Sequence, residues 1–115
     1  MITIYHNPRC SKSREALALL QQHSDEPLNI VEYLKTPPTA AELTAILAKL
    51  NIPARALLRT SEADYSRLQL DNPQLSEQQL IKAMSEYPKL IERPIVINGE
   101  RAAIGRPLSN VSAIL

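Results

Sequence analysis

The sequence ITIYHNPRCSKSREALALLQQ, residues 2–22, decides how the chain begins its fold. Residues 2–5 are β-branched or aromatic and run into an Asn-Pro pair, a pattern that predicts a short strand ending in a turn. Residues 11–22 place apolar side chains on one helical face, with Ser11 or Ser13 expected to cap the first turn. We therefore expect a strand, a turn and a helix at the start of the chain.

The next segments predict a second strand and then a block of helices. Residues 28–33 contain several β-branched and aromatic side chains, so they are expected to form a strand that completes a βαβ unit. Residues 37–87 show helical spacing of apolar side chains and two capping boxes, which begin at Thr39 and Ser76. We interpret this block as a helical insertion. Two shorter helical segments are expected within it, over residues 53–58 and 65–70.

The C-terminal part predicts a hairpin and a last helix. Apolar runs over residues 95–97 and 101–104 flank Asn98-Gly99, a strong hairpin signal, and Pro107 suits the first position of a helix. The first two strands are expected to be parallel and the hairpin antiparallel, which gives a small mixed sheet with helices on it. The sequence therefore predicts one α/β domain, residues 1–115, with a thioredoxin-like order: βαβ, helical insertion, ββα.

The composition excludes several classes of function. The 115 residues include 13 Lys plus Arg and 12 Asp plus Glu, a balance that argues against nucleic-acid binding or a basic membrane contact. Two glycines leave no room for a glycine-rich nucleotide loop, and one Cys with two His excludes a Cys/His zinc cage. No apolar run is long enough to span a membrane. We expect a soluble, cytoplasmic monomer that holds no metal and no bound cofactor.

Cys10 is the candidate reactive group, because it lies between the first strand and the first helix. Backbone N–H groups and the helix dipole at such a place favour a thiolate over a thiol. The cations Arg9, Lys12 and Arg14 are expected to act in the same direction, as is His6 if it is charged or donates a hydrogen bond to sulfur. A thiolate here would attack an electrophile, and the helix N-terminus would favour an anion.

The residues alone leave the role of Cys10 open. A free Cys is more often a small buried side chain with no chemistry. An internal C-x-x-C disulfide is excluded because Ser13 stands where the second Cys would be. A phosphatase-like C-x(5)-R loop is also absent, since Ala16 occupies the Arg position. Any thiol that resolves an adduct on Cys10 must therefore come from another molecule.

Several segments along the chain carry a resemblance to a known family. In order, they are HNPRCSKSR (residues 6–14), YLKTPPT (33–39), RALLR (55–59), ERPIVI (92–97) and GRP (105–107). Together they resemble the glutaredoxin-linked arsenate reductase family of the ArsC type. Because the match follows the same order over nearly the whole chain, it is far more specific than any single segment.

The resemblance implies an enzyme that reduces arsenate to arsenite. Cys10 would be the nucleophile that forms a thiolate–arsenate adduct, and Arg59, Arg93 and Arg106 would hold the oxyanion. Guanidinium groups suit this task because they offer paired, permanently charged donors. Glutathione would be the co-substrate, and glutaredoxin would accept the mixed disulfide. On the residues alone, Arg59 is better explained as a structural charge at a helix end, whereas Arg93 and Arg106 are explained about equally well as structural charges or as ligands.

The resemblance also implies supporting residues. His6 matches a histidine that helps to lower the thiol pKa, and Ser13 is expected to support the same loop. The Arg93-Pro94 bond resembles the cis-proline position of thioredoxin-like folds, which packs opposite the reactive thiol. The pKa effect and the cis bond rest on the resemblance and not on spacing.

Two alternatives to arsenate reduction remain open. Spx-type regulators look similar in fold and contact RNA polymerase, although their usual C-x-x-C switch is missing here. A glutathione-dependent reductase of another small electrophile would use Cys10 in the same role. The loop after Cys10 also reads Ser-Lys-Ser-Arg where the better-known arsenate reductases carry Gly-Thr-Ser-Arg.

Overall fold

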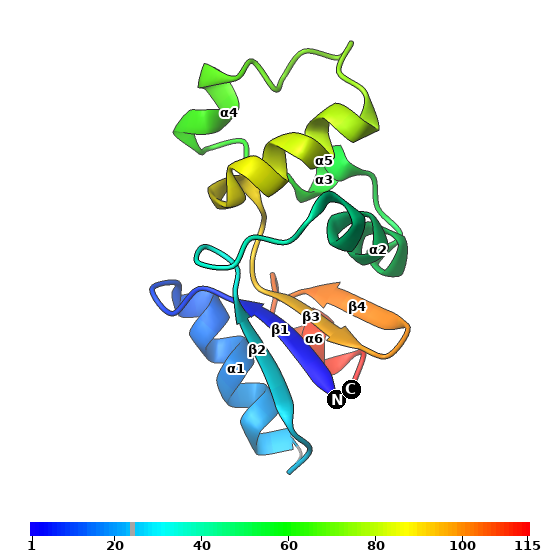
Figure 1. Cartoon of the computed structure of the whole chain (residues 1–115). Coiled ribbons are helices and arrows are strands. Elements are labelled where there is room, and N and C mark those ends of the chain that lie inside the picture. Colours follow the sequence, from blue (N-terminus) through cyan, green and yellow to red (C-terminus); the bar gives the residue numbers. More distant parts are fainter. Residues whose placement is uncertain (24) are drawn as a thin grey trace. The chain divides into compact units, whose positions relative to one another are not determined.

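The structure is a computed structural model that describes residues 1–23 and 25–115 (Figure 1). The chain packs into two compact units, one made of Met1–Thr36 and Arg93–Leu115 and the other of Pro37–Glu92. The second unit is thus one continuous segment that divides the first unit in the sequence. Among the described residues, no helix has both the length and the apolar character needed to cross a bilayer.

A four-stranded mixed sheet organises the first unit. Its strands are β1 (Ile2–His6), β2 (Leu28–Glu32), β3 (Ile95–Asn98) and β4 (Arg101–Ile104), in the spatial order β2-β1-β3-β4 (Figure 1). β1 and β2 are parallel, whereas β3 is antiparallel to both β1 and β4. This arrangement confirms the predicted mixed sheet and the thioredoxin-like fold.

Two helices share the apolar core on one face of this sheet. α1 (Ser11–His23) contributes Ala16 and Leu20, and α6 (Ser109–Ser112) contributes Val111. These side chains pack against alternate strand residues, which point to the same face of a sheet. The buried members of this cluster are Ile2, Ile4, Ala16, Leu20, Val96 and Val111.

The last helix is shorter than the sequence predicts. α6 begins at Ser109, not at Pro107, and ends at Ser112. The Pro107 carbonyl still accepts a hydrogen bond from the Asn110 N–H at 3.0 Å, so Pro107 lies in a turn that precedes the helix. The predicted apolar side chains beyond the helix end, Ile114 and Leu115, nevertheless pack against the core.

The β3–β4 hairpin also turns one residue later than predicted. Asn98 pairs with Arg101, so the two central turn residues are Gly99 and Glu100, not Asn98 and Gly99. Gly99 has φ +64°, the value that a type II′ turn requires at its first central position. The Asn98 Nδ2 donates a hydrogen bond to the Ile114 carbonyl at 2.8 Å, and this contact holds Asn98 in the strand.

The second unit consists of short helices around its own apolar core. They are α2 (Ala40–Leu50), α3 (Ala54–Leu57), α4 (Ala63–Arg67), α5 (Glu77–Glu86) and the 3₁₀ turn η1 (Pro88–Leu90). Both predicted capping boxes are confirmed, because Thr39 caps α2 and Ser76 caps α5. The buried apolar side chains of these helices are Leu43, Ile46, Leu47, Ala54, Leu57, Leu80, Ile81, Met84 and Leu90.

The two shorter helices begin at other residues than predicted. α3 starts at Ala54, one residue after Pro53, and its first N–H donates to Glu77 Oε2 at 2.8 Å. α4 covers Ala63–Arg67 and not residues 65–70. Gln69 adopts φ +54°, a left-handed conformation that ends the helical path.

Candidate active site

Cys10 lies at the N-terminal end of α1. Its carbonyl accepts the first helical hydrogen bond, from the Arg14 N–H at 3.0 Å, and its own N–H donates to the Asn7 carbonyl at 3.0 Å. Cys10 is therefore the residue at the cap position, and the prediction that Ser11 or Ser13 caps this helix is wrong. The side chain that meets the unsatisfied helix N–H groups is thus a thiol.

The pKa of the Cys10 thiol lies below its ordinary value. Burial of the sulfur raises the pKa, but the Ser13 N–H, the Arg93 charge, the Lys12 N–H and the Arg106 charge all lower it and outweigh burial. Backbone N–H groups and guanidinium charges both stabilise the negative sulfur. Cys10 is 8% exposed, so the thiolate is mostly shielded from water.

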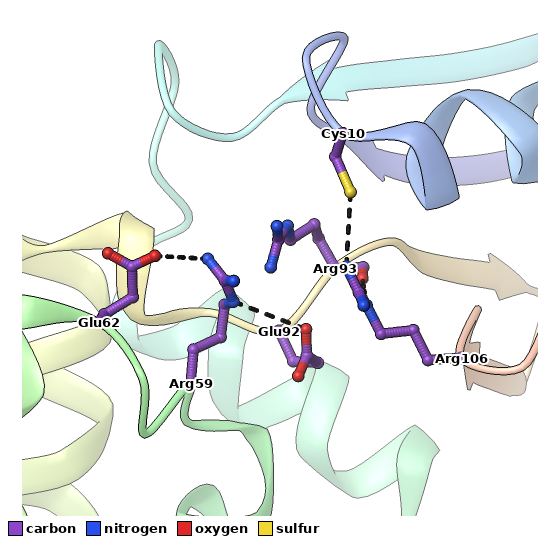
Figure 2. A network of polar contacts seen from close by, with 6 residues as sticks. All are labelled: Cys10, Arg59, Glu62, Glu92, Arg93 and Arg106. Atoms are coloured by element: carbon purple, nitrogen blue, oxygen red, sulfur yellow. Dashed lines mark hydrogen bonds and ion pairs between the residues drawn. The ribbon is translucent and has the colours of Figure 1, made fainter.

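Arg106 approaches the sulfur directly. Its Nη2 lies 3.5 Å from Cys10 Sγ, and its Nε donates to the Arg93 carbonyl at 2.9 Å (Figure 2). The Arg93 carbonyl therefore orients the guanidinium that faces the thiol. The Arg93-Pro94 bond is cis, as predicted, and the Arg106-Pro107 bond is cis as well. The structure thus brings Cys10, Arg93 and Arg106 together from three separate segments of the first unit.

Gly105 is needed for this arrangement. Its N–H donates to the Pro94 carbonyl at 2.9 Å. A Cβ at position 105 would lie only 2.8 Å from Pro94 Cγ, closer than such atoms approach in proteins. The absence of a side chain at Gly105 therefore lets the segment before Arg106 pack against Pro94.

Ser13 connects His6 to the helix that carries Cys10. The Ser13 Oγ accepts a hydrogen bond from the Asn7 N–H at 2.9 Å and lies 2.6 Å from His6 Nδ1. The hydroxyl has one donor and two acceptor sites, so it can serve both the Asn7 N–H and His6 Nδ1. Burial is the main cause that lowers the pKa of His6, which favours its neutral form. The Ser13 N–H, in turn, stabilises the Cys10 thiolate.

Two of the cations next to Cys10 in the sequence, Lys12 and Arg14, have other partners. Arg14 Nη1 donates to the Pro8 carbonyl at 2.9 Å, and Lys12 Nζ pairs with Glu15 at 3.8 Å. The charges that lower the thiol pKa are instead those of Arg93 and Arg106. Lys12 acts through its backbone N–H and not through its side chain.

Arg59 belongs to the second unit and is held by two carboxylates there. Its Nη1 donates to Glu62 Oε1 at 2.5 Å, and its Nε lies 3.8 Å from Glu92 Oε1 (Figure 2). The Arg59 N–H also donates to the Leu90 carbonyl at 2.8 Å. The predicted role of Arg59 as an oxyanion ligand stays a prediction.

Comparison with known proteins identifies the family. A family model described as the ArsC family matches residues 5–114. This chain belongs to the ArsC family. A protein named arsenate reductase from Haemophilus influenzae is 50% identical over 115 residues, covering 99% of this chain and 98% of that protein. One of the same name from Neisseria meningitidis serogroup A is 47% identical, covering 99% of this chain and 97% of the relative.

A solved structure agrees with this family assignment. The structure titled "Arsenate reductase from Vibrio cholerae" superposes with a TM-score of 0.95 at 45% identity. The match covers 99% of this ArsC-family chain and 97% of the other. Both the fold and the family that the sequence resemblance implied are therefore confirmed.

Sequence reasoning missed residues that position the candidate side chains of this ArsC-family chain in each unit. Gly105 belongs to the GRP segment of the family resemblance, but its close packing against Pro94, which leaves no room for a Cβ, has no signal in the sequence. Glu62 and Glu92, which hold Arg59, gave no signal beyond ordinary surface charge. The spacing of Glu62 three residues after Arg59 is typical of a local ion pair and is the one clue that the sequence contains.

Proposed function

We propose that this ArsC-family chain reduces arsenate to arsenite, with Cys10 as the nucleophile and glutathione and glutaredoxin as its thiol partners. The observation that carries the proposal is the Cys10 sulfur at a helix N-terminus with Arg106 Nη2 at 3.5 Å. Such a site combines a reactive thiolate with a guanidinium suited to a tetrahedral oxyanion. The names of the close relatives supply the choice of arsenate.

The first step forms a covalent adduct. The Cys10 thiolate attacks arsenic, an S–As bond forms and one As–O bond breaks. The departing oxygen takes up protons from the solvent and leaves as water, while arsenic stays As(V). Arg93 and Arg106 would offset the negative charge that otherwise repels the thiolate from the oxyanion.

The second step transfers two electrons to arsenic. A glutathione thiolate attacks the Cys10 sulfur, an S–S bond forms and the S–As bond breaks. The electron pair of that bond stays on arsenic, which leaves as arsenite in the As(III) state. A glutaredoxin thiol then attacks the glutathione sulfur and releases Cys10 as a thiolate. An external thiol is required because Cys10 is the only Cys in the chain.

The test follows NADPH consumption with arsenate, glutathione, glutathione reductase and glutaredoxin. The wild-type chain is expected to show arsenate-dependent turnover, and Cys10→Ser is expected to show none. Omission of glutaredoxin from the mixture provides a second control, because the mixed disulfide between glutathione and Cys10 should then accumulate. A folded wild-type chain with a reactive Cys10 but no arsenate-dependent turnover would contradict the proposal and favour another electrophile or a regulatory role.

A further inference from the structure

A small hollow lies beside the loop that leads to Cys10. It has a volume of about 200 Å³ and belongs entirely to the first unit. One wall is the end of β1 and the following loop, residues 6–9, and the other is the end of β2 with Glu32, Leu34 and Lys35. The chain runs from Arg9 in this wall directly into Cys10, so the hollow and the reactive thiol belong to one continuous loop.

Two cations and one carboxylate line the hollow. Arg9 and Lys35 provide two cations, and Glu32 provides one carboxylate, which lies 3.6 Å from Lys35 Nζ. Glutathione has the complementary set, with two carboxylates and one ammonium group. Leu34 and Pro8 add apolar surface for the methylene groups of such a peptide. The hollow is smaller than a typical ligand pocket, so it would hold one end of the tripeptide and leave the thiol outside.

The second chemical step needs the attacking thiol and the oxyanion on different sides of Cys10 Sγ. Displacement at sulfur is in line, so the attacking thiolate enters on the side of Cys10 Sγ opposite the departing arsenic. Arg93 and Arg106, which would hold the oxyanion, come from the segments next to β3 and β4. The hollow lies at the ends of β1 and β2, and β1 separates β2 from β3 in the order β2-β1-β3-β4.

We propose that this hollow, between the loop of residues 6–9 and the end of β2 at Glu32–Lys35, is the binding site for the resolving glutathione. The inference rests on the proposed function, because it assigns a place to the co-substrate of that reaction. It adds a thiol site on the β2 side of Cys10, separate from the oxyanion site on the β3 side.

The main test measures thiol exchange at Cys10 without arsenate. The single Cys is first converted to its thionitrobenzoate disulfide, and the coloured leaving group is then released by either glutathione or 2-mercaptoethanol. Lys35→Gln is expected to lower the glutathione rate roughly 2- to 5-fold, as for the loss of one exposed ion pair. It should leave the 2-mercaptoethanol rate unchanged, because that thiol carries no charge to bind.

Arg101→Gln is the matched control. Arg101 is an exposed cation of the same unit on β4, outside the hollow, so its loss should leave both rates unchanged. The proposal is overturned if both variants change the glutathione rate equally, or if Lys35→Gln lowers both thiol rates in proportion. Because no arsenate is present, this result is independent of whether the chain reduces arsenate.

A second measurement covers binding without reaction. ¹⁵N-labelled Cys10→Ser is titrated with S-methylglutathione, which cannot form a disulfide. The largest amide shifts are expected within residues 6–9 and 32–35. Shifts centred on Pro94 and Gly105 instead, or no shift at all, would place the thiol site elsewhere and overturn the proposal.

Discussion

Ser13→Ala is the most informative single substitution in the first unit. Ser13 is 0% exposed, and its hydroxyl serves two neighbours, His6 Nδ1 at 2.6 Å and the Asn7 N–H at 2.9 Å. Alanine removes the hydroxyl but keeps the backbone N–H that stabilises the Cys10 thiolate. The substitution therefore separates the stability of the loop from the reactivity of the thiol.

The expected loss of stability follows from the burial of the two partners. His6 is 6% exposed, so its Nδ1 has little access to water, and loss of the Ser13 hydroxyl as its hydrogen-bond partner costs about 1–3 kcal/mol. Asn7 is half-buried, so water partly replaces the lost bond and the cost there is about 0.5–1.5 kcal/mol. We expect a total decrease of roughly 1.5–4.5 kcal/mol in the free energy of unfolding.

Urea unfolding followed by circular dichroism measures this change. Ser11→Ala is the matched control, because Ser11 is an exposed serine in the same helical turn and its loss should stay within about 0.5 kcal/mol. The iodoacetamide alkylation profile against pH should keep its low midpoint in Ser13→Ala. Equal stability of the two variants would refute the hydrogen-bond network, and a midpoint raised to that of a free cysteine would refute the role of the backbone N–H.

Other predictions address the charges and the packing. Arg106→Met should raise the pH midpoint of Cys10 alkylation by iodoacetamide. Inorganic phosphate should raise that midpoint in the wild-type chain but much less in Arg106→Met. Gly105→Ala should cost about 1–3 kcal/mol in urea unfolding, because its Cβ would overlap Pro94. The lowered pKa of His6 means that the unfolded state binds a proton more readily. The stability due to neutral His6 should therefore be complete above pH 6.5, the ordinary pKa of histidine, and should decrease as the pH falls below that value. Urea unfolding of His6→Gln against pH should lack this decrease.

The parts of the fold that local signals specify were predictable. The capping boxes at Thr39 and Ser76 were found because all their hydrogen bonds join residues three positions apart. The strand pair around Gly99 was found for a similar reason. The turn itself was misplaced by one residue because Asn98 bonds to the Ile114 carbonyl, a contact that local pattern cannot show.

The geometry around Cys10 was less accessible to sequence reasoning. Arg93 and Arg106 are far from Cys10 along the chain, and only the family resemblance suggested that they meet it. Physical reasoning from spacing instead favoured Arg14 and Lys12, whose side chains are engaged with Pro8 and Glu15. The position of Cys10 at a helix N-terminus correctly predicted a low thiol pKa. That position does not indicate which charged side chains lower the pKa.

The two kinds of group that stabilise the thiolate have different fates when an anion binds. The N–H groups of Lys12 and Ser13 are fixed by α1 and hold the sulfur whether or not an oxyanion is present. The charges of Arg93 and Arg106 would act on both the thiolate and a bound oxyanion. An oxyanion bound there would offset the positive charge that lowers the thiol pKa. A site that relied on the arginines alone would lose its thiolate as the substrate arrived. In the proposed reaction, the N–H groups of the helix N-terminus would therefore keep Cys10 a thiolate while Arg93 and Arg106 hold the oxyanion.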